Sequence, residues 1–286
     1  MKLVAIGGGH GTAVTLRALS RISEDVTGIV SVADDGGSTG RLRAMLNVAA
    51  VGDLRKCLGA LADPHNPLAA AFEHRFHAGE LEGHTVGNLF LVGLIDATGN
   101  LEESIDAAAG VLGVRGTILP ASRDGVVLVA SHGEGVTRGQ TAVAKTTGIR
   151  FISLDPPSPP APLRALAALS QADVIVIGPG SLFTSVLAAC VVPDINRAIA
   201  ASHARKIYVA NLRPEDSETL GFGLQDHVDA LRAHGIEPTD VIVDSASQFA
   251  NQPCQVRAFV TSVTGRNPLV HDVPKLTQAV IDACAK

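Results

Sequence analysis

Aromatic residues are scarce in this chain of 286 residues. It has no Trp, a single Tyr and 3% aromatic residues in all, so it lacks the aromatic platform on which single-stranded nucleic acids stack. Its net charge of −5 at pH 7 also leaves no basic excess for binding a phosphate backbone. We therefore expect no nucleic acid partner.

Cysteine is rare as well, and its spacing excludes the common disulfide and metal motifs. The four cysteines are scattered, and none belongs to a Cys-x-x-Cys pair. This pattern predicts free thiols, as in a reducing cytoplasm, rather than a disulfide framework. The residues concerned are Cys57, Cys190, Cys254 and Cys284.

Long hydrophobic runs are also missing, with one exception. The uncharged stretch from Val174 to Val192 approaches the roughly 20 residues that a membrane-spanning helix needs. Because Gly178–Ser181 interrupts it, we interpret it as a strand, a loop and a helix of a soluble core. The N-terminal residues Met1 and Lys2 lead directly into a strand-like segment, so we expect no signal peptide and a cytoplasmic protein.

Hydrophobic residues are abundant, at 46% of the chain, and they occur in short runs of two kinds. Runs typical of buried strands alternate with helix-period runs, which predicts an α/β fold with a mostly parallel sheet and helices on both faces. Alternating residues around Ser131–Gly135 predict a β-hairpin added to the main sheet. The proline-rich run 155–162 is either a domain boundary or a stiff surface loop. We favour the loop, because a helix-like run and the second glycine loop follow at once, so we expect a single domain over residues 1–286.

The strands expected from these patterns are Leu3–Ile6, Gly28–Ala33, Val126–Ala130, Val174–Ile177, Ile207–Ala210 and Val241–Val243. The expected helices include Ala13–Ile22, Leu54–Leu61, Asn88–Ile95, Leu163–Leu169 and Leu224–Ala233.

Two glycine loops, Gly7–Thr12 and Gly178–Thr184, each follow a strand-like run and precede an apolar, helix-like run. Glycine lets a backbone approach a ligand closely, and the N-terminus of the following helix attracts anions. Ligands of open parallel sheets bind beyond the carboxyl ends of the strands, which is where these loops should lie. We therefore predict a phosphate-bearing ligand, such as a nucleotide or a phosphosugar. Candidate contacts are Gly8, Gly9, His10, Gly11, Thr12, Gly178, Gly180, Ser181 and Thr184.

The segment after the second strand is rich in acidic, hydroxyl and basic residues. Asp34 and Asp35 either bond ribose hydroxyls, as acids do at this place in dinucleotide folds, or hold Mg²⁺ beside a phosphate. Ser38 adds a hydroxyl, and Arg41 and Arg43 can pair with phosphate oxygens. The alternative is a charged turn before a capped helix. Acids and glycines are seldom so dense in plain turns, so we favour a binding site.

The remaining candidates have ordinary structural roles as alternatives. Asp53 can be the N-cap of a helix, and Arg55 either reaches the pocket or lies in solvent. His84, like His10, is either a ligand contact or an ordinary structural histidine. Thr85 and Asn88 either cap a helix or bond sugar and phosphate oxygens. A further candidate ends a strand and should border the cleft: Asn211.

Taken in order, these motifs resemble those of the YvcK-type gluconeogenesis-factor family, a branch of the CofD-like superfamily. Each motif alone is weak, but the ordered set is specific and extends over nearly the whole chain. The resemblance implies a Rossmann-like fold in the cytoplasm of a bacterium. The segments that carry it are Gly7–Thr12, Asp34–Arg43, Gly52–Arg55, Gly83–Asn88 and Gly178–Thr184.

The resemblance also implies a function. It implies binding of UDP-N-acetylglucosamine, with NAD(P) as another ligand, and a role in cell shape and wall synthesis during gluconeogenic growth, through wall-synthesis partners. Our leading hypothesis is a regulatory protein, because the sequence shows no evident nucleophile. One alternative is a metal-dependent CofD-like transferase that moves a phospholactyl group to or from a nucleotide carrier. Another is an NAD(P)-binding oxidoreductase, although no hydride-transfer constellation is evident. A homo-oligomer is compatible with each of these.

Overall fold

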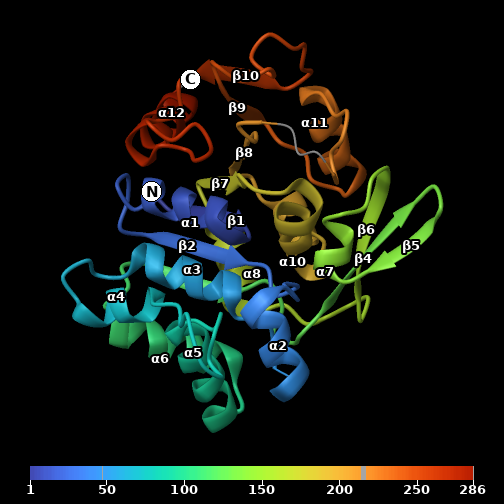
Figure 1. The fold of residues 1–286 in the computed structure, drawn as a ribbon. Helices are drawn as coiled ribbons and strands as arrows, with labels where there is room; N and C mark the ends of the chain where they lie inside the picture. Colours follow the sequence, from blue (N-terminus) through green and yellow to red (C-terminus); the bar gives the residue numbers. More distant parts are fainter. Residues whose placement is uncertain (47, 214–216, 286) are drawn as a thin grey trace.

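A parallel sheet of seven strands forms the centre of the molecule (Figure 1). The computed structural model describes residues 1–46, 48–213 and 217–285. The strand order is β10-β9-β8-β7-β1-β2-β3, and every neighbouring pair is parallel. The strands are β1 Leu3–Gly7, β2 Val26–Val30, β3 Thr117–Pro120, β7 Val174–Ile177, β8 Arg205–Val209, β9 Asp240–Asp244 and β10 Arg257–Thr261.

Helices cover both faces of this sheet (Figure 1), as the alternating pattern predicts. Strands β1, β2, β7 and β9 are buried along their whole length, which explains their nearly uninterrupted apolar sequences. The helices are α1 Gly9–Leu19, α2 Gly37–Leu46, α3 Gly52–Leu61, α4 Pro67–Glu73, α5 Val86–Thr98, α6 Leu101–Leu112, α7 Gln140–Val143, α8 Leu163–Gln171, α9 Ala188–Cys190, α10 Pro193–Ala201, α11 Leu224–Ala233 and α12 Val273–Ala285.

The predicted hairpin is present, but its predicted attachment to the main sheet is wrong. Strands β4 (Val127–His132) and β5 (Gly135–Arg138) are antiparallel, as expected. They belong to a separate sheet of order β5-β4-β6, in which β6 is Ile149–Asp155. β6 pairs with the edge of β4 that faces away from β5, and no described strand of this small sheet pairs with the main sheet. Strand β6 was not predicted, because its buried and exposed residues do not alternate strictly.

Two short edge strands of the main sheet also escaped prediction. Strand β3 ends in Pro120, which cannot donate a ladder hydrogen bond and is confined to sheet edges. Strand β10 is largely exposed and begins with a charged residue, Arg257. Edge strands lack the continuous apolar run that marks a buried parallel strand. The other predicted strands and helices are confirmed, with boundaries shifted by a few residues.

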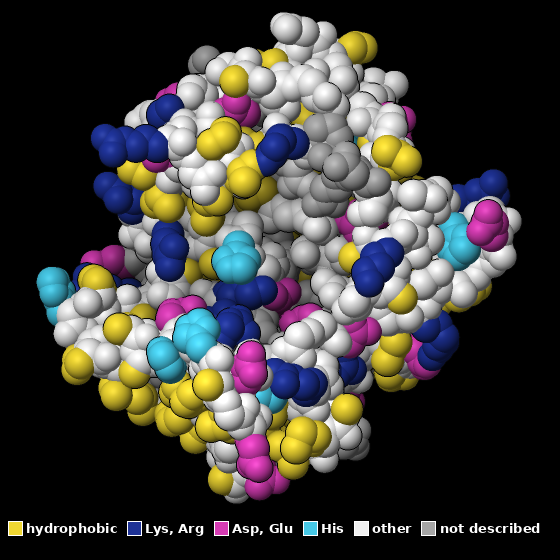
Figure 2. All heavy atoms as spheres, in the orientation of Figure 1, with side chains coloured by type: hydrophobic (Ala, Val, Ile, Leu, Met, Phe, Trp, Pro, Cys, Tyr) yellow, Lys and Arg dark blue, Asp and Glu magenta, His cyan; other side chains and the backbone are white. Residues whose placement is uncertain are grey.

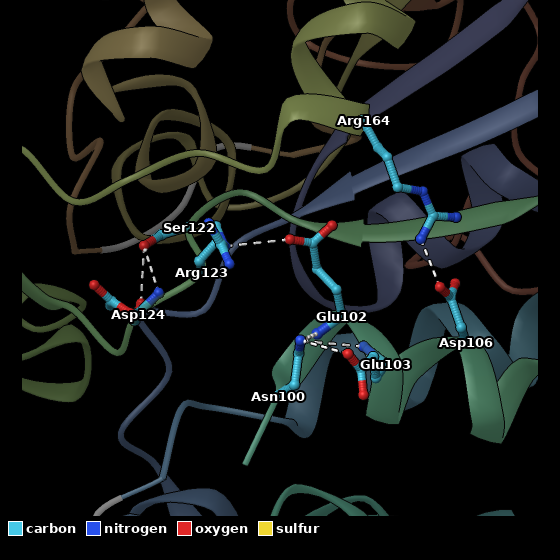
Figure 3. Close-up of polar contacts among 8 residues, drawn as sticks. All are labelled: Asn100, Glu102, Glu103, Asp106, Ser122, Arg123, Asp124 and Arg164. Atoms are coloured by element: carbon cyan, nitrogen blue, oxygen red, sulfur yellow. Dashed lines mark hydrogen bonds and ion pairs between the residues drawn. The ribbon is translucent and has the colours of Figure 1, made fainter. Parts of the chain in front are cut away.

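Helix α6 is joined to its neighbours by polar contacts near its N-terminus (Figure 3). Asn100 caps the helix, since its side chain accepts hydrogen bonds from the backbone N–H groups of Glu102 and the next residue. Glu102 pairs with Arg123 at 3.4 Å, and Asp106 pairs with Arg164 at 2.6 Å. Exposed ion pairs of this kind contribute about 0–1 kcal/mol, so they orient α6 more than they stabilise it.

The second glycine loop leads into a π-helix, η1 (Leu182–Leu187), which continues as α9. Within the described part of the chain, no single helix is long and apolar enough to cross a membrane. The segments Leu182–Cys190 and Pro193–Ala201 meet the length and composition criteria only as a pair, and the chain bends by 78° between them.

The cysteines are free thiols, as predicted. Cys57 and Cys190 are fully buried, and burial raises the pKa of both thiols, that of Cys190 to about 12. Both therefore remain protonated at neutral pH and serve as small core residues.

Candidate functional site

The two glycine loops meet where the strand order reverses. From β1 the chain continues through β2 and β3 on one side of the sheet, whereas β7 begins the series that fills the other side. Because β1 and β7 are parallel neighbours, both loops leave the same edge of the sheet, at a topological switch point. Thr15 of α1 donates a hydrogen bond of 2.8 Å to the carbonyl oxygen of Gly178. The loops predicted to share a ligand are therefore adjacent.

A cleft of about 360 Å³ opens beside these loops. Figure 2 shows one face of the molecule, in which basic, acidic and histidine side chains gather around a central hollow. The volume is at the lower end of the range for small-molecule sites. Its described lining residues come from both loops, from the end of β8 and from a C-terminal segment: His10, Gly11, Val14, Pro179, Gly180, Asn211, Leu212, Arg213, Leu269, Val270 and His271.

The first loop is built into the start of α1. Gly8 is the N-cap, and the helix begins at Gly9, whose φ of 69° lies in the region that favours glycine. Thr12 is fully buried and donates a hydrogen bond of 3.1 Å to the carbonyl oxygen of Gly8. Of the predicted contacts in this loop, His10 and Gly11 therefore face the cleft, while Thr12 supports the loop from behind.

The second loop is held differently. Asn211, at the end of β8, accepts a hydrogen bond of 3.1 Å from the backbone N–H of Gly180. Ser181 occupies the N-cap position of η1, but its side chain makes no capping hydrogen bond. Instead the buried carboxylate of Glu218 accepts a bond of 3.2 Å from the N–H of Phe183. Thr184 is buried inside η1. A protein carboxylate thus already occupies this helix start, whereas the N-cap of α1 is a glycine and no acidic residue of α1 itself lies in its first turn.

Two carboxylates lie behind the first loop. The alternative interpretation of Asp53 as an N-cap is wrong, because Asp53 lies in the first turn of α3, whose N-cap is Val51. A Cβ added at Gly8 would lie 2.6 Å from Oδ2 of Asp53, so the two are in close contact. Asp53 pairs with Lys56 at 2.9 Å. Burial and the neighbouring charge of Asp53 raise the pKa of Asp34 above its usual value.

The raised pKa of Asp34 gives a stability prediction. Because the pKa of Asp34 is higher in the folded than in the unfolded protein, the folded state binds this proton more tightly. The contribution of Asp34 to stability is therefore fully present below the unfolded pKa and is lost as pH rises through the folded pKa. Asp34→Asn removes the charge and should raise the melting temperature at pH 8, with a smaller gain at pH 5. Calorimetry at both pH values measures this difference. A lower melting temperature for the variant at pH 8 would contradict it.

Asp35 and the nearby arginines make structural contacts. The Asp35 carboxylate accepts hydrogen bonds from the backbone N–H and the hydroxyl of Thr141, at 2.8 and 2.7 Å, and so joins the second strand's loop to α7. Arg43 donates to the backbone oxygens of Asp34 and Val126. Arg41 donates to a backbone oxygen of the 76–84 loop at 2.7 Å. None of these three side chains is among the described residues that line the cleft.

Ser38, His84 and Asn88 form a second, buried cluster. The Ser38 hydroxyl accepts a bond of 3.1 Å from the Asn88 amide and lies 2.9 Å from Nδ1 of His84. Thr85 is the N-cap of α5, as one interpretation of its motif predicted. Burial and the charges of Arg41 and its neighbour Arg75 lower the pKa of His84, so its imidazole is neutral at pH 7. This cluster packs α5 against α2 and does not line the described cleft.

Arg55 is buried, so its interpretation as a solvated side chain is wrong. It is 4% exposed, forms an ion pair with Glu73, and its Nε lacks a hydrogen-bond partner among the described residues. The pKa of His10 is lowered, first by burial and then by the positive charges of Lys56 and Arg55. The positive charges of α3 therefore extend their field to the mouth of the cleft.

No group of three or more His, Cys, Asp or Glu residues could hold a metal ion in the described chain. Mg²⁺ normally uses one or two carboxylates together with phosphate oxygens and water. Asp34 and Asp53 fit that use only alongside a phosphate-bearing ligand.

The C-terminal wall of the cleft was not predicted from the sequence. Leu269, Val270 and His271 lie far from the glycine loops in sequence and carry no motif. The available signal was weak: a lone histidine shortly before α12, a helix that was not among those predicted.

Comparisons with known proteins agree with this geometry. The family model described as 2-phospho-L-lactate transferase CofD matches residues 3–286. The chain belongs to the CofD family. A crystal structure of a UPF0052 family member from Bacillus halodurans is similar to this CofD family member, with a TM-score of 0.90, 35% identity and 98% of each chain covered.

Related sequences point to the gluconeogenesis-factor branch of the CofD family. A protein of Halalkalibacterium halodurans named gluconeogenesis factor is 42% identical over 235 residues, covering 81% of this chain and 73% of the relative. A gluconeogenesis-factor relative from Mycobacterium tuberculosis is 38% identical, covering 99% and 90%. Another from Nostoc sp. is 46% identical, covering 81% of this chain. The chain matches only 52% of the length of the Nostoc protein.

Proposed function

We propose that this CofD family member binds a nucleotide sugar, UDP-N-acetylglucosamine, in the cleft between its glycine loops. The observation that carries the proposal is the meeting of both loops at the switch point of the sheet, beside a cleft of about 360 Å³. The start of α1 has neither a capping side chain nor an acid in its first turn. Its N–H groups and the positive end of its dipole suit a diphosphate.

The proposed role is regulatory rather than catalytic. The described lining residues offer backbone groups, an amide, an arginine, two histidines and an apolar wall, but no serine, cysteine or carboxylate nucleophile. Together with the similarity to gluconeogenesis factors, this supports a cytoplasmic protein that senses the ligand and acts on wall synthesis and cell shape through protein partners.

Isothermal titration tests the binding step. We expect saturable heat with UDP-N-acetylglucosamine, weaker binding with UDP and none with N-acetylglucosamine, because the diphosphate supplies the contacts with the first loop. NAD belongs in the same panel, since a dinucleotide is the alternative ligand. Absence of heat at millimolar UDP-N-acetylglucosamine would contradict the proposal.

A CofD-like transferase is the second candidate, favoured by the carboxylates of Asp34 and Asp53 behind the first loop. With Mg²⁺ on a bound diphosphate, these residues could orient the metal and its water ligands. The test is incubation with Mg²⁺ and a phospholactyl or phosphoenolpyruvyl donor. Turnover that is lost in Asp34→Asn would establish an enzyme.

A further inference from the structure

The two edges of the main sheet differ in how they are closed. Strand β3, at one edge, is mostly buried and ends in Pro120, which has no N–H group to offer a further strand. Strand β10, at the other edge (Figure 1), is largely exposed, and among the described residues it pairs only with β9. Exposed edge strands bind further strands unless a proline, a bulge or an outward charge prevents it.

None of these protective features is present on β10. Its residues include no proline, and its register with β9 is regular. Its one charged residue, Arg257, is turned back onto its own sheet. The Arg257 side chain donates a hydrogen bond of 2.6 Å to Asp240, and its guanidinium lies 4.9 Å from the centre of the Phe259 ring. The free edge of β10 is therefore open to another strand.

The hydrogen bonds to β9 show which backbone groups of β10 are free. The carbonyl oxygen of Thr261 accepts a bond of 2.9 Å from the N–H of Ser245, so the backbone groups of Thr261 point towards β9. Successive residues of a strand direct these groups to opposite sides, so Phe259 also bonds to β9. Ala258 and Val260 direct their N–H and C=O groups away from the sheet. Each of them thus offers one donor and one acceptor to a partner.

A groove of about 590 Å³ lies beside this strand. It is lined by every residue of β10 and by Ala279 and Asp282 of α12. Val260 is 47% exposed here, so an apolar side chain flanks the free backbone groups. The charged residues of the described lining are one arginine, Arg257, and one aspartate, Asp282. The edge therefore has no net charge that would repel a second copy of itself.

We propose that β10 pairs antiparallel with β10 of a second copy of this chain, so that the two main sheets form one continuous sheet. With the two-fold axis at Phe259, Ala258 of each copy lies opposite Val260 of the other. In this register every outward N–H group of these residues meets a carbonyl oxygen of the other copy. The chain thus supplies both the free edge and its complement, and such a contact closes at two copies. The inference does not depend on the ligand site.

Sedimentation velocity tests the dimer. Pairing through one short strand is at the small end of protein interfaces, so we expect dimers at about 100 µM protein and monomers at about 1 µM. Val260→Pro removes an outward N–H group that makes no bond to β9, so it should remain monomeric at the higher concentration. Val260→Thr is the control, because it keeps the N–H group and should dimerise as the wild type does. At the lower concentration both variants should melt near the wild-type temperature, because no dimer then adds to stability.

Cysteine cross-linking tests the register. Residues that face each other in an antiparallel pair without exchanging hydrogen bonds have Cα atoms about 4.5 Å apart, within reach of a disulfide. Phe259→Cys should therefore cross-link two copies under mild oxidation. Val260→Cys is the matched control. Residue 260 of the two copies would be diagonal neighbours about 7–8 Å apart, so this variant should not cross-link although Val260 is the more exposed residue. The wild type, with its own free cysteines, is the blank.

Three results would each overturn the inference. One is a wild type that stays monomeric at the higher concentration, which would leave the groove to a different occupant. Another is a dimer that persists in Val260→Pro, which would place the contact on a different face. The third is cross-linking of Val260→Cys but not of Phe259→Cys, which would move the two-fold axis away from Phe259.

Discussion

Replacing Gly11 with Ala is expected to abolish ligand binding in the cleft and to destabilise the protein. A Cβ at this position would lie 2.0 Å from the carbonyl oxygen of Pro179 and 2.6 Å from its carbonyl carbon. Both atoms belong to the backbone of the second glycine loop, which cannot move aside as a flexible side chain could. The two loops must separate, so the cleft between β1 and β7 loses its shape. Overpacking of this kind costs about 1–3 kcal/mol or more.

Gly93→Ala is the matched control for this substitution. Gly93 is exposed on α5, and an added Cβ would meet no atom within 4 Å. Alanine is the better helix former by about 1 kcal/mol, so this variant should be as stable as the wild type or slightly more stable. Urea unfolding and titration with UDP-N-acetylglucosamine measure both effects. If Gly11→Ala keeps the wild-type affinity, the loops do not form the ligand site.

The glycine loops could be predicted because their signal is local. A buried strand, a glycine run and an apolar helix follow one another within a few residues, and parallel strands place such loops at one edge of the sheet. The sequence alone thus predicted that Gly7–Thr12 and Gly178–Thr184 lie at strand ends. It could not show that the N-terminus of η1 is capped by Glu218, because that contact joins residues 35 positions apart.

The rest of the site depends on contacts that no local pattern encodes. Asp34 and Asp35 are adjacent in sequence, yet Asp34 lies near Asp53 while Asp35 binds Thr141, 106 residues away. His271 lines the cleft although it lies far from both glycine loops in the sequence. The hairpin's sheet was missed for the same reason, since the partner of β4 could not be read from β4 itself. Which distant residues become neighbours is known only once the strand order and the side-chain contacts are known.

The second large effect is a loss of stability that we expect from a substitution at the amino ends of the strands, which lie opposite the site. Asp240, at the start of β9, is 1% exposed and pairs with Arg205 of β8 and Arg257 of β10, both at 2.6 Å. Removing its carboxylate leaves two guanidinium groups facing each other across β9. Breaking a buried ion pair costs about 3–5 kcal/mol, and we expect about 3 kcal/mol for Asp240→Ala because both arginines reach solvent.

Asp106→Asn is the control, because its pair with Arg164 is exposed on both sides and should contribute about 0–1 kcal/mol. Urea unfolding should separate the two variants clearly. Titration at a temperature where Asp240→Ala is still folded should give the wild-type affinity for UDP-N-acetylglucosamine, since the ion cluster and the cleft lie at opposite ends of the strands. A loss of affinity without unfolding would mean that ligand binding depends on the amino ends of the sheet, and would contradict a site confined to the switch point.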